Sequence, residues 1–484
     1  MSLPQFEVTH YINGEFVESK QTFEKLYPAT NQPVAAVSEG KQDEVNAAVE
    51  AAANAFKTWG KMTPSARRPI LKRFAEGIRQ CADELAKIET YDVGRPLREN
   101  VGGYLERVAN NIDFFADFAA MHGSEAYPMD NGYINYVLRQ PVGVAVLITP
   151  WNIPLLLETW KIGPCLAFGN TAVLKPAETT PIGAWKLAQI AHEAGLPAGV
   201  FNVVQGFGPE SAGEYLTRHP DVKLISFTGE TATGQAILRA AADSMARVSF
   251  ELGGKGPNIV FEDVDMERAL AVSKKAAFVN QGEVCLSGCR ILVQRGIYNE
   301  FVERFADKLV AETVLGDPMS MDTTMGAINS REHIRRVMGY LQTGRREGKI
   351  LIGGDQPDMP APFDQGNWLN PTIILDAVPD TRVNQEEIFG PVVTIMPFDE
   401  EEEAVSIANG VRYGLSAVVQ TRDTGRAVRV SSQIDAGTVW VNDWFVRDLR
   451  VPFGGMKASG VGREGGQYSL EFYTEAKTVC LANQ

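Results

Sequence analysis

The sequence predicts an α/β fold built on parallel sheets that helices cover on both faces. Short, uninterrupted apolar runs at 143–149, 171–175, 200–204 and 224–227 indicate strands. Segments with apolar residues at helical spacing, such as 155–168, lie between these runs. Strands that are apolar on both faces and alternate with helices are typical of a parallel sheet buried on each side. We therefore expect a doubly covered parallel sheet.

Two helical segments precede this series, and a second α/β series follows it. Residues 43–58 and 64–93 are rich in Ala, Leu, Glu, Lys and Arg with helical apolar spacing, which predicts two surface helices. After Gly253 the alternation begins again, with a strand at 258–261, a helix from about 265 to 280, a strand at 291–293 and more helix to about 315. We expect a domain boundary near Gly253.

Length and charge limit the classes of protein that fit. A chain of 484 residues exceeds one ordinary core, so two or more domains are expected. The net charge of -14, from 60 acidic and 46 basic residues, argues against sequence-independent binding to nucleic acid or to an anionic membrane. The composition instead suits a small-molecule enzyme or a binding protein.

The number and spacing of the cysteines and histidines indicate in which cellular compartment the protein works and whether it binds a metal. The five cysteines form no disulfide framework, which favours a reducing compartment: Cys81, Cys165, Cys285, Cys289 and Cys480. The five histidines make no recognisable metal motif. The first residues lack a signal peptide's basic start and apolar core, and no run approaches the roughly 18 apolar residues of a membrane span. We expect a cytoplasmic protein without a metal.

Cys285 and Glu251 are the candidates for covalent chemistry. Cys285 ends the stretch Phe-Val-Asn-Gln-Gly-Glu-Val-Cys, and Glu251 stands in Phe-Glu-Leu-Gly-Gly-Lys, a helix-length spacer earlier. A deprotonated thiol attacks a carbonyl, and a carboxylate can activate the water that hydrolyses the resulting thioester. An isolated cysteine is more often a small buried hydrophobe. Neighbouring motifs therefore have to decide between the two readings.

Further motifs accompany this pair in a fixed order: Thr149-Pro-Trp-Asn152, Thr171-Ala-Val-Leu-Lys175-Pro-Ala-Glu178, Phe227-Thr-Gly-Glu-Thr-Ala-Thr-Gly234 and Glu387-Ile-Phe-Gly-Pro391. With them, the chain resembles the aldehyde dehydrogenase superfamily from end to end. The resemblance implies a Rossmann-like parallel-sheet cofactor domain, a second α/β catalytic domain and a small β oligomerisation element. The respective boundaries would be 1–120 with 142–252, then 253–450, and 123–141 with 467–484.

The oligomerisation element would contain strands at 133–138 and from 469–473 onward, and would form a homodimer or homotetramer. The alternation of apolar and polar residues over 133–138 independently favours a strand.

The resemblance also implies a reaction. The Cys285 thiolate would add to an aldehyde, hydride would pass to the nicotinamide of NAD, and water deprotonated by Glu251 would release a carboxylic acid. The side-chain amide of Asn152 and the backbone N–H of Cys285 would hold the oxyanion, a contribution of about 3 to 4 kcal/mol to the barrier. The alternative role for Asn152 is to cap the next helix.

Two glycine-containing turns are candidates for the cofactor phosphates. The turn that contains Gly208 has two of the three glycines of the dinucleotide fingerprint, and an ordinary strand-to-helix turn explains it equally well. Gly229 ends an apolar strand and opens a helix, where free backbone N–H groups can receive a pyrophosphate. The family commonly has serine where this chain has Glu230, whose carboxylate would repel the pyrophosphate unless it swings outward. We expect Gly229 and the backbone, rather than Glu230, to make the contact.

Other cofactor contacts follow from the resemblance. Lys175 and Glu178 would bind the adenosine ribose, where a carboxylate disfavours a 2′-phosphate and so favours NAD over NADP. A solvated surface ion pair is the alternative for these two residues. Glu387 would bind the nicotinamide ribose, with Trp151 and Gly390 lining the cofactor site.

The substrate is suggested by the segments 441–455 and 462–466, which are similar to those of 2-hydroxymuconate and 2-aminomuconate semialdehyde dehydrogenases. Arg447 in the first segment and Arg107 in an earlier helix would together clamp a substrate carboxylate. Residues 104–106 depart from the Ile-Pro that these relatives commonly have before the arginine.

Alternatives to this substrate assignment remain. Arg447 could instead pair with Asp448 or Asp443, and Arg107 with Glu106 or another neighbour on its helix. The runner-up substrate is a neutral aromatic aldehyde of the benzaldehyde type. A protein of another class, a non-catalytic NAD-binding or structural protein, would not need the full set of Cys285, Glu251 and Asn152. A CoA-acylating reaction would not need Glu251 as a hydrolytic base. Cys289 could protect Cys285 or oxidise with it.

Overall fold

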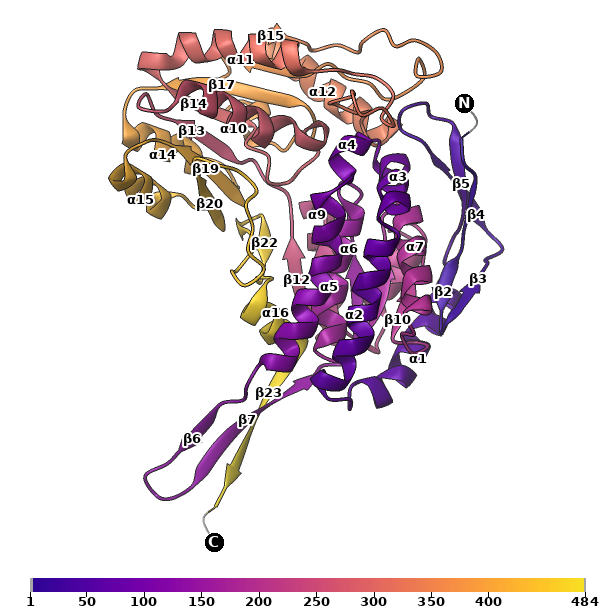
Figure 1. Cartoon of the computed structure of the whole chain (residues 1–484). Coiled ribbons are helices and arrows are strands. Elements are labelled where there is room, and N and C mark those ends of the chain that lie inside the picture. Colours follow the sequence, from indigo (N-terminus) through magenta and orange to yellow (C-terminus); the bar gives the residue numbers. More distant parts are fainter. Residues whose placement is uncertain (1–2, 483–484) are drawn as a thin grey trace.

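A large mixed sheet, built mainly from the first half of the chain, organises one lobe of the protein (Figure 1). The computed structural model describes residues 3–482. The strands of this sheet are, in spatial order, β22 (Gly460–Val461), β12 (Arg247–Glu251), β11 (Val222–Thr228), β8 (Val144–Ile148), β9 (Thr171–Lys175), β10 (Phe201–Val203), β2 (His10–Ile12) and β3 (Glu15–Val17). The run from β12 to β10 is parallel, which confirms the predicted parallel sheet.

Helices cover both faces of this sheet because its strands are apolar on both faces. In β8, Ala145 and Leu147 belong to one core, and Val144 and Val146 belong to the other. The first core is built with α2 (Pro64–Gln80), α3 (Ala82–Val93), α5 (Gly103–Met121), α6 (Pro154–Ala167) and α7 (Pro181–Glu193). The second is built with α1 (Gln42–Trp59), α8 (Ala212–Arg218) and α9 (Thr231–Ser244).

The predicted single helix over 64–93 is wrong. The backbone leaves helical geometry at Cys81 (φ -95°, ψ 12°), so α2 ends there and α3 begins at Ala82. Asp83 and Glu84 in the first turn of α3 favour a new helix start. The apolar spacing continues across the break, with Ile78 and Leu85 both in the same core, so periodicity alone could not reveal it.

A second sheet organises the other lobe. Its strands are β15 (Lys349–Ile352), β16 (Thr372–Leu375), β17 (Val392–Phe398), β14 (Arg290–Gln294), β13 (Pro257–Val260), β19 (Ser416–Gln420) and β20 (Thr438–Val441). All neighbours pair in parallel except β15 with β16. One face packs on α10 (Met266–Phe278) and α11 (Tyr298–Glu312), and the other on α14 (Glu401–Asn409) and α15 (Thr424–Gln433). This lobe confirms the second predicted α/β series.

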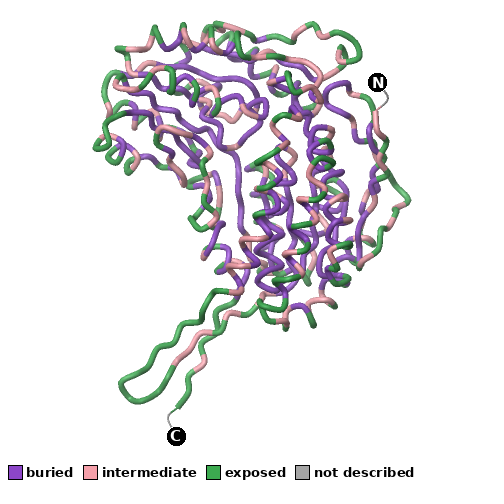
Figure 2. The backbone as a smooth tube through the Cα atoms, viewed as in Figure 1, coloured by how far each residue is buried: buried purple, intermediate pink, exposed green. Residues whose placement is uncertain are grey.

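A three-stranded sheet projects from the body of the molecule (Figure 1), and Figure 2 shows its backbone as mostly exposed. It consists of β23 (Thr474–Leu481), β7 (Ile134–Pro141) and β6 (Ala126–Pro128). β7 confirms the strand predicted over 133–138. The strand predicted from 469–473 is wrong there, because these residues lie in α16 (Gly466–Tyr473). Leu470 and Tyr473, three residues apart, are buried together in the first core, which a helix allows.

The remaining elements were not predicted from the sequence. They are a small sheet of β1 (Phe6–Val8), β5 (Pro33–Ser38) and β4 (Thr22–Leu26), the strands β18 (Tyr413–Gly414) and β21 (Met456–Lys457), the helices α4 (Leu97–Asn100), α12 (Arg331–Glu347) and α13 (Arg382–Gln385), and the 3-10 turns η1 (Val279–Gly282) and η2 (Arg295–Ile297). Within residues 3–482, every helix is too short or too polar to cross a bilayer.

Arg290, the first residue of β14, ties the second sheet to the end of α14. Its buried guanidinium donates to the carbonyl oxygens of Lys255 (3.0 Å), Ile407 (2.8 Å) and Ala408 (2.8 Å).

We predict that Arg290→Met lowers the free energy of unfolding by about 3 kcal/mol or more, because three buried carbonyls lose a charged donor. Urea denaturation followed by circular dichroism measures this. The control is Arg295→Met, an exposed partner of Asp399, which should leave unfolding unchanged; equal loss in both variants would contradict the role of Arg290.

Candidate active site

The carboxyl ends of strands in the first sheet face the amino ends of strands in the second. In Figure 1 the β12 arrow points toward the lobe that contains the second sheet. Glu251 is the last residue of β12, and the chain then crosses through Gly253 and Gly254 to β13. A Cβ on Gly254 would collide with the carbonyl oxygen of Cys285, and one on Gly253 with the carboxylate of Glu387. The two glycines thus let both of these predicted site residues approach the end of β12.

Cys285 follows a strained turn. Asn280, Gln281 and Gly282 have successive positive φ values of 52°, 55° and 72°. The turn is held by buried hydrogen bonds: the Asn280 side-chain amide donates to the carbonyl of Asn152 (2.9 Å), and Gln281 accepts from the N–H of Gly326 (3.2 Å). Positive φ at a non-glycine residue persists only where the surroundings impose it. The position of the half-buried Cys285 is therefore fixed by its flanking residues.

Asn152 lies beside the same turn. Its buried side-chain amide donates one hydrogen bond to the carbonyl oxygen of Glu283 (2.8 Å), two residues before Cys285. An amide nitrogen carries two hydrogens, so a second donor remains. Helix α6 begins at Pro154 with Ile153 as its N-cap. The side chain of Asn152 thus bonds the nucleophile loop rather than the helix end.

Glu251 is a buried carboxylate in an environment of mixed charge. Neither of its oxygens has a hydrogen-bond partner within the described chain. Burial raises the pKa of Glu251 to about 8; repulsion from Glu464 adds to this, and the positive charges of Lys161 and of two arginines, Arg447 and Arg463, oppose it. A carboxyl with a pKa near neutrality is suited to accept a proton from water.

Lys161 and Glu464 are site residues that the sequence reasoning missed. Lys161 Nζ contacts Glu464 Oε1 (2.9 Å) and Ser226 Oγ (2.8 Å), and the indole N–H of Trp160 donates to the other oxygen of Glu464. Lys161 is fully buried in the largely apolar α6. Lys161 and Glu158 are charged residues in an otherwise apolar helix, and this was the available signal, because a buried charge requires a partner.

The Cys285 thiol is protonated in this environment. Burial raises the pKa of Cys285 to about 12, and the nearby Glu387 and Glu251 carboxylates add to the effect, while the backbone N–H groups of Cys285 and Leu286 oppose it. Burial likewise raises the pKa of Glu387 to about 7, partly offset by the hydrogen bond that its carboxylate accepts from the N–H of Gly254 (2.8 Å). Positive charge close to the sulfur would be needed to favour the thiolate.

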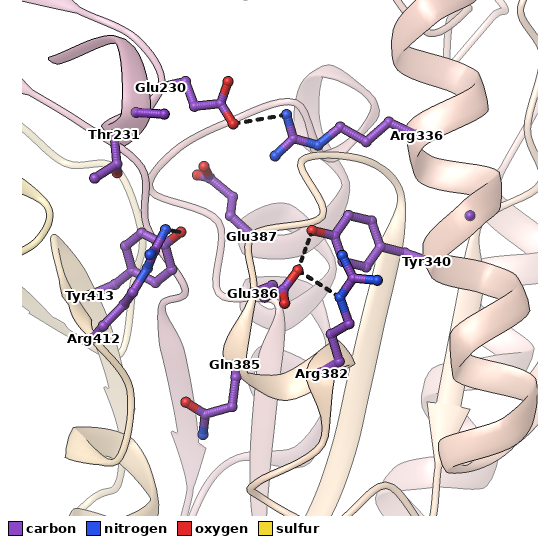
Figure 3. Close-up of a pocket in the computed structure, with 12 residues that line it drawn as sticks. Glu230, Thr231, Arg336, Tyr340, Arg382, Gln385, Glu386, Glu387, Arg412 and Tyr413 are labelled. Carbon is purple, nitrogen blue, oxygen red and sulfur yellow. Dashed lines mark hydrogen bonds and ion pairs between the residues drawn. The ribbon is translucent and has the colours of Figure 1, made fainter. Parts of the chain in front are cut away.

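A cavity of about 680 Å³ opens at the start of α9 and reaches Glu387 (Figure 3). The first hydrogen bond within α9 runs from the N–H of Gly234 to the carbonyl of Glu230, so the preceding N–H groups lack helical acceptors. The N–H of Gly229 itself donates to the carbonyl of Glu251 (3.0 Å). A polar cavity that ends on a helix N-terminus and a carboxylate fits a dinucleotide with its pyrophosphate and ribose.

Glu230 turns toward Arg336 on α12, with its carboxylate 3.1 Å from the guanidinium (Figure 3). This ion pair spans the cavity between the two lobes and counters the negative charge that the sequence places at the start of α9. Arg336 was not predicted from the sequence, and no motif around it gave a signal.

The other predicted cofactor residues are not among those that line this cavity. Lys175 ends β9 and contacts Glu178 at 3.4 Å; burial lowers the pKa of Lys175. The Trp151 ring packs edge-on against Phe389, with centroids 5.1 Å apart, and the carbonyl of Gly390 adjoins the strained turn at Gly282.

Gly208 lies in the loop before α8, and its carbonyl accepts from the N–H of Glu214 (2.9 Å). A Cβ there would meet no protein atom within 4 Å, so packing alone does not explain this glycine.

No cluster of three or more potential ligands among His, Cys, Asp and Glu is arranged for a metal within residues 3–482.

Arg447 is a half-buried residue whose guanidinium has no ion-pair partner among the described residues. Its guanidinium lies 3.7 Å from the ring centroid of Trp160 and 4.0 Å from that of Phe453, and its Nε and Nη2 atoms have no hydrogen-bond acceptor among the residues described. Burial lowers the pKa of Arg447 to about 10; Glu464 and Glu251 oppose the shift.

The carboxylates proposed as alternative partners are engaged elsewhere. Asp448 pairs with Arg450 (2.6 Å), and Asp443 pairs with Lys275 (3.0 Å). Glu106, the alternative partner of Arg107, bonds Arg79 (2.8 Å). The Arg107 guanidinium instead lies 4.6 Å from the ring centroid of Phe445, close enough to Arg447 for mutual repulsion.

Comparisons with known proteins identify the family. A model of the aldehyde dehydrogenase family matches residues 16–479. The 2-hydroxymuconic semialdehyde dehydrogenase of Pseudomonas sp. (strain CF600) is 49% identical over 486 residues, with 98% of this chain and 99% of the relative covered. The 2-aminomuconic semialdehyde dehydrogenase of Danio rerio is 44% identical over 476 residues, with 98% and 97% covered.

The fold has counterparts among solved structures. A mutant of the indole-3-acetaldehyde dehydrogenase AldA of P. syringae, in complex with NAD+ and IAA, superposes with a TM-score of 0.94 at 36% identity, covering 98% of this chain and 96% of that one. The resemblance indicated by the motifs and the predicted fold class are both confirmed. The chain belongs to the aldehyde dehydrogenase family.

Proposed function

We propose that this protein oxidises the aldehyde group of a muconic semialdehyde, an aldehyde that also carries a carboxylate, to a carboxylic acid with NAD. The observation that carries this proposal is the buried, unpaired guanidinium of Arg447, with Arg107 beside it. A buried cation without a protein anion is costly and is suited to an anionic ligand. The relatives named for 2-hydroxymuconic and 2-aminomuconic semialdehydes support the same substrate class. A neutral aromatic aldehyde would not supply a counter-ion for the Arg447 guanidinium.

The proposed chemistry assigns one role to each catalytic residue. The Cys285 sulfur attacks the carbonyl carbon, and the developing oxyanion accepts from the free amide hydrogen of Asn152 and the N–H of Cys285. NAD, when bound, supplies a positively charged ring that favours the thiolate and accepts the hydride from the adduct. Glu251 then removes a proton from the water that attacks the thioester, and the acid departs as Cys285 regains a proton. The oriented Asn152 amide and the unpaired Glu251 oxygens support these roles.

The cofactor would extend from the cavity at the start of α9 toward the carboxyl end of β9. Lys175 and Glu178 would hold the adenosine ribose, the start of α9 with Gly229 the pyrophosphate, and Glu387 the nicotinamide ribose. The Gly208 loop, Trp151 and Gly390 would line the site. The carboxylate at the end of β9 favours NAD over NADP, because it would repel a 2′-phosphate.

We also propose that three parts of the chain have separate functions. Residues 1–120 and 142–252 would bind the cofactor, 253–450 would carry the catalytic cysteine, and 123–141 with 467–484 would join subunits into a homodimer or homotetramer. The exposed projecting sheet supports the last assignment. The five cysteines are free thiols in the described chain, which suits the cytoplasm as a reducing compartment.

Replacing Glu251 should separate the two halves of the reaction. We predict that Glu251→Ala forms the thioester but hydrolyses it at least about 100-fold more slowly, because no base activates the water. Intact-protein mass spectrometry after aldehyde and NAD addition should show an acyl adduct. The control Cys285→Ala should bind NAD yet show neither turnover nor adduct. A slow Glu251 variant without any adduct would contradict the base role, and turnover by Cys285→Ala would contradict a catalytic thiol.

Removing the proposed clamp should change selectivity. We predict that Arg447→Ala raises KM for a semialdehyde acid by roughly 30-fold or more, the loss of about 2 kcal/mol from a charged hydrogen bond, and changes KM for benzaldehyde by less than about threefold. The control is Arg450→Ala on the same loop, whose exposed side chain already pairs with Asp448. Equal effects on both aldehydes would remove the clamp and favour the aromatic substrate.

The carboxylate of Glu230 should make NAD bind less tightly, so its removal should improve binding. We predict that Glu230→Gln lowers KM for NAD by roughly two- to fivefold, because it removes a carboxylate near the pyrophosphate and releases Arg336. NADH absorbance at varied NAD concentration measures this. Glu300→Gln, which removes an exposed glutamate paired with Arg304, is the control and should change nothing. A rise in KM would mean that Glu230 itself holds the cofactor.

A further inference from the structure

We propose that the carboxylate of the substrate, by neutralising Arg447, strengthens Glu251 as a base, so that Arg447 couples substrate recognition to water activation. This inference rests on the proposed function and deepens it. The claim concerns the thioester stage, when the acyl group on Cys285 still carries the carboxylate that the clamp holds.

Arg447 is held by aromatic rings rather than by an ion pair. Its guanidinium lies between Trp160 and Phe453, at 3.7 Å and 4.0 Å from their ring centroids. Cation–π contacts fix its position but leave its full positive charge and its N–H donors available. A substrate carboxylate would therefore be the first anion to meet this guanidinium directly.

Both aromatic residues connect Arg447 to the surroundings of the base. Gly454 follows Phe453, and a Cβ on Gly454 would lie 2.8 Å from Glu251 Oε1. The backbone of Phe453 exchanges two hydrogen bonds with that of Glu464, each 2.8 Å long. Trp160 donates its indole N–H to the Glu464 carboxylate. Arg447 therefore lies one residue contact away from Glu464 and from the backbone beside Glu251.

Arg447 is the cation near Glu251 whose charge a ligand can change. The groups that face Glu251 are the carboxylate of Glu464, the cations of Lys161, Arg447 and Arg463, and the Cys285 thiol. Lys161 is paired with Glu464, and Arg463 donates to the carbonyls of Gly455 (2.9 Å) and Gly462 (2.7 Å).

Neutralising Arg447 removes one attraction that keeps Glu251 ionised. The pKa of Glu251 then rises further above its ordinary value. A carboxylate with a higher pKa is a stronger base once it is ionised. A neutral aldehyde leaves the charge of Arg447 in place, so its thioester meets a weaker base.

The test compares two substrates that differ only in charge. The first is a semialdehyde acid, and the second is its primary amide. Thioester decay is followed by rapid-quench mass spectrometry in single turnover from pH 6 to 10. In the wild-type protein, decay of the acid should rise with pH around a midpoint about 0.5 to 1 pH unit higher than that of the amide, and reach a faster plateau.

Two variants isolate the cause. In Arg447→Gln the acid and amide midpoints should coincide, because no charge remains to be neutralised. In Arg450→Gln, on the same loop, the difference should persist as in the wild type.

Two outcomes separate this inference from the proposed function. Equal midpoints for acid and amide in the wild-type protein would overturn the coupling, a result that needs no variant to fold. If Arg447→Gln then still raises KM for the acid alone, the clamp stands without the coupling. If Arg447→Gln binds and turns over the acid as the wild type does, the proposed substrate class fails as well.

Discussion

The close approach of the two sheets at Gly253 and Gly254 is the constraint on which the site depends. The carboxyl end of β12 carries Glu251, and the two following residues have no side chain, so Glu387 and Cys285 can lie against this stretch of backbone. A side chain at residue 254 would press on the backbone of Cys285 and force the two lobes apart, whereas one at residue 253 would displace the carboxylate of Glu387. The proposed chemistry needs the reacting groups to be positioned precisely relative to one another. The crossing between the two sheets brings the segments that carry these groups together.

Burial of charge is the second theme of the site. Glu251, Glu387 and Cys285 all have a raised pKa because the protein surrounds them, and Arg447 has a lowered one. Such an arrangement costs folding free energy, because each group would be better solvated in water. It also makes each group sensitive to the charge of whatever binds, which a solvated site could not achieve.

The sequence predicted most of the framework, and its main candidate residues, Cys285, Glu251 and Asn152, lie around the crossing between the two sheets. The buried strands of both sheets were visible as apolar runs, since a strand covered on both faces has few polar positions. The break at Cys81 was not visible, because apolar spacing continues through it. The residues of α16 were taken for a strand because the family resemblance implied a strand from 469 onward, whereas the observed strand β23 begins at Thr474. Lys161, Glu464 and Arg336 were missed for a different reason: each contacts a residue distant in sequence, and even the charge of Lys161 in an apolar helix does not reveal which residue it pairs with. The unpaired state of Arg447 likewise became visible only when Asp448 and Asp443 were seen to bond other cations.

The pairing of β7 with β23 has a consequence for biogenesis. β7 emerges from the ribosome long before its partner β23. Closing so long a loop is slow, and until it closes β7 has an unpaired edge on the side opposite the short strand β6. A chain that has not yet been translated through β23 would therefore expose backbone N–H and C=O groups along this edge, where other strands can pair with it.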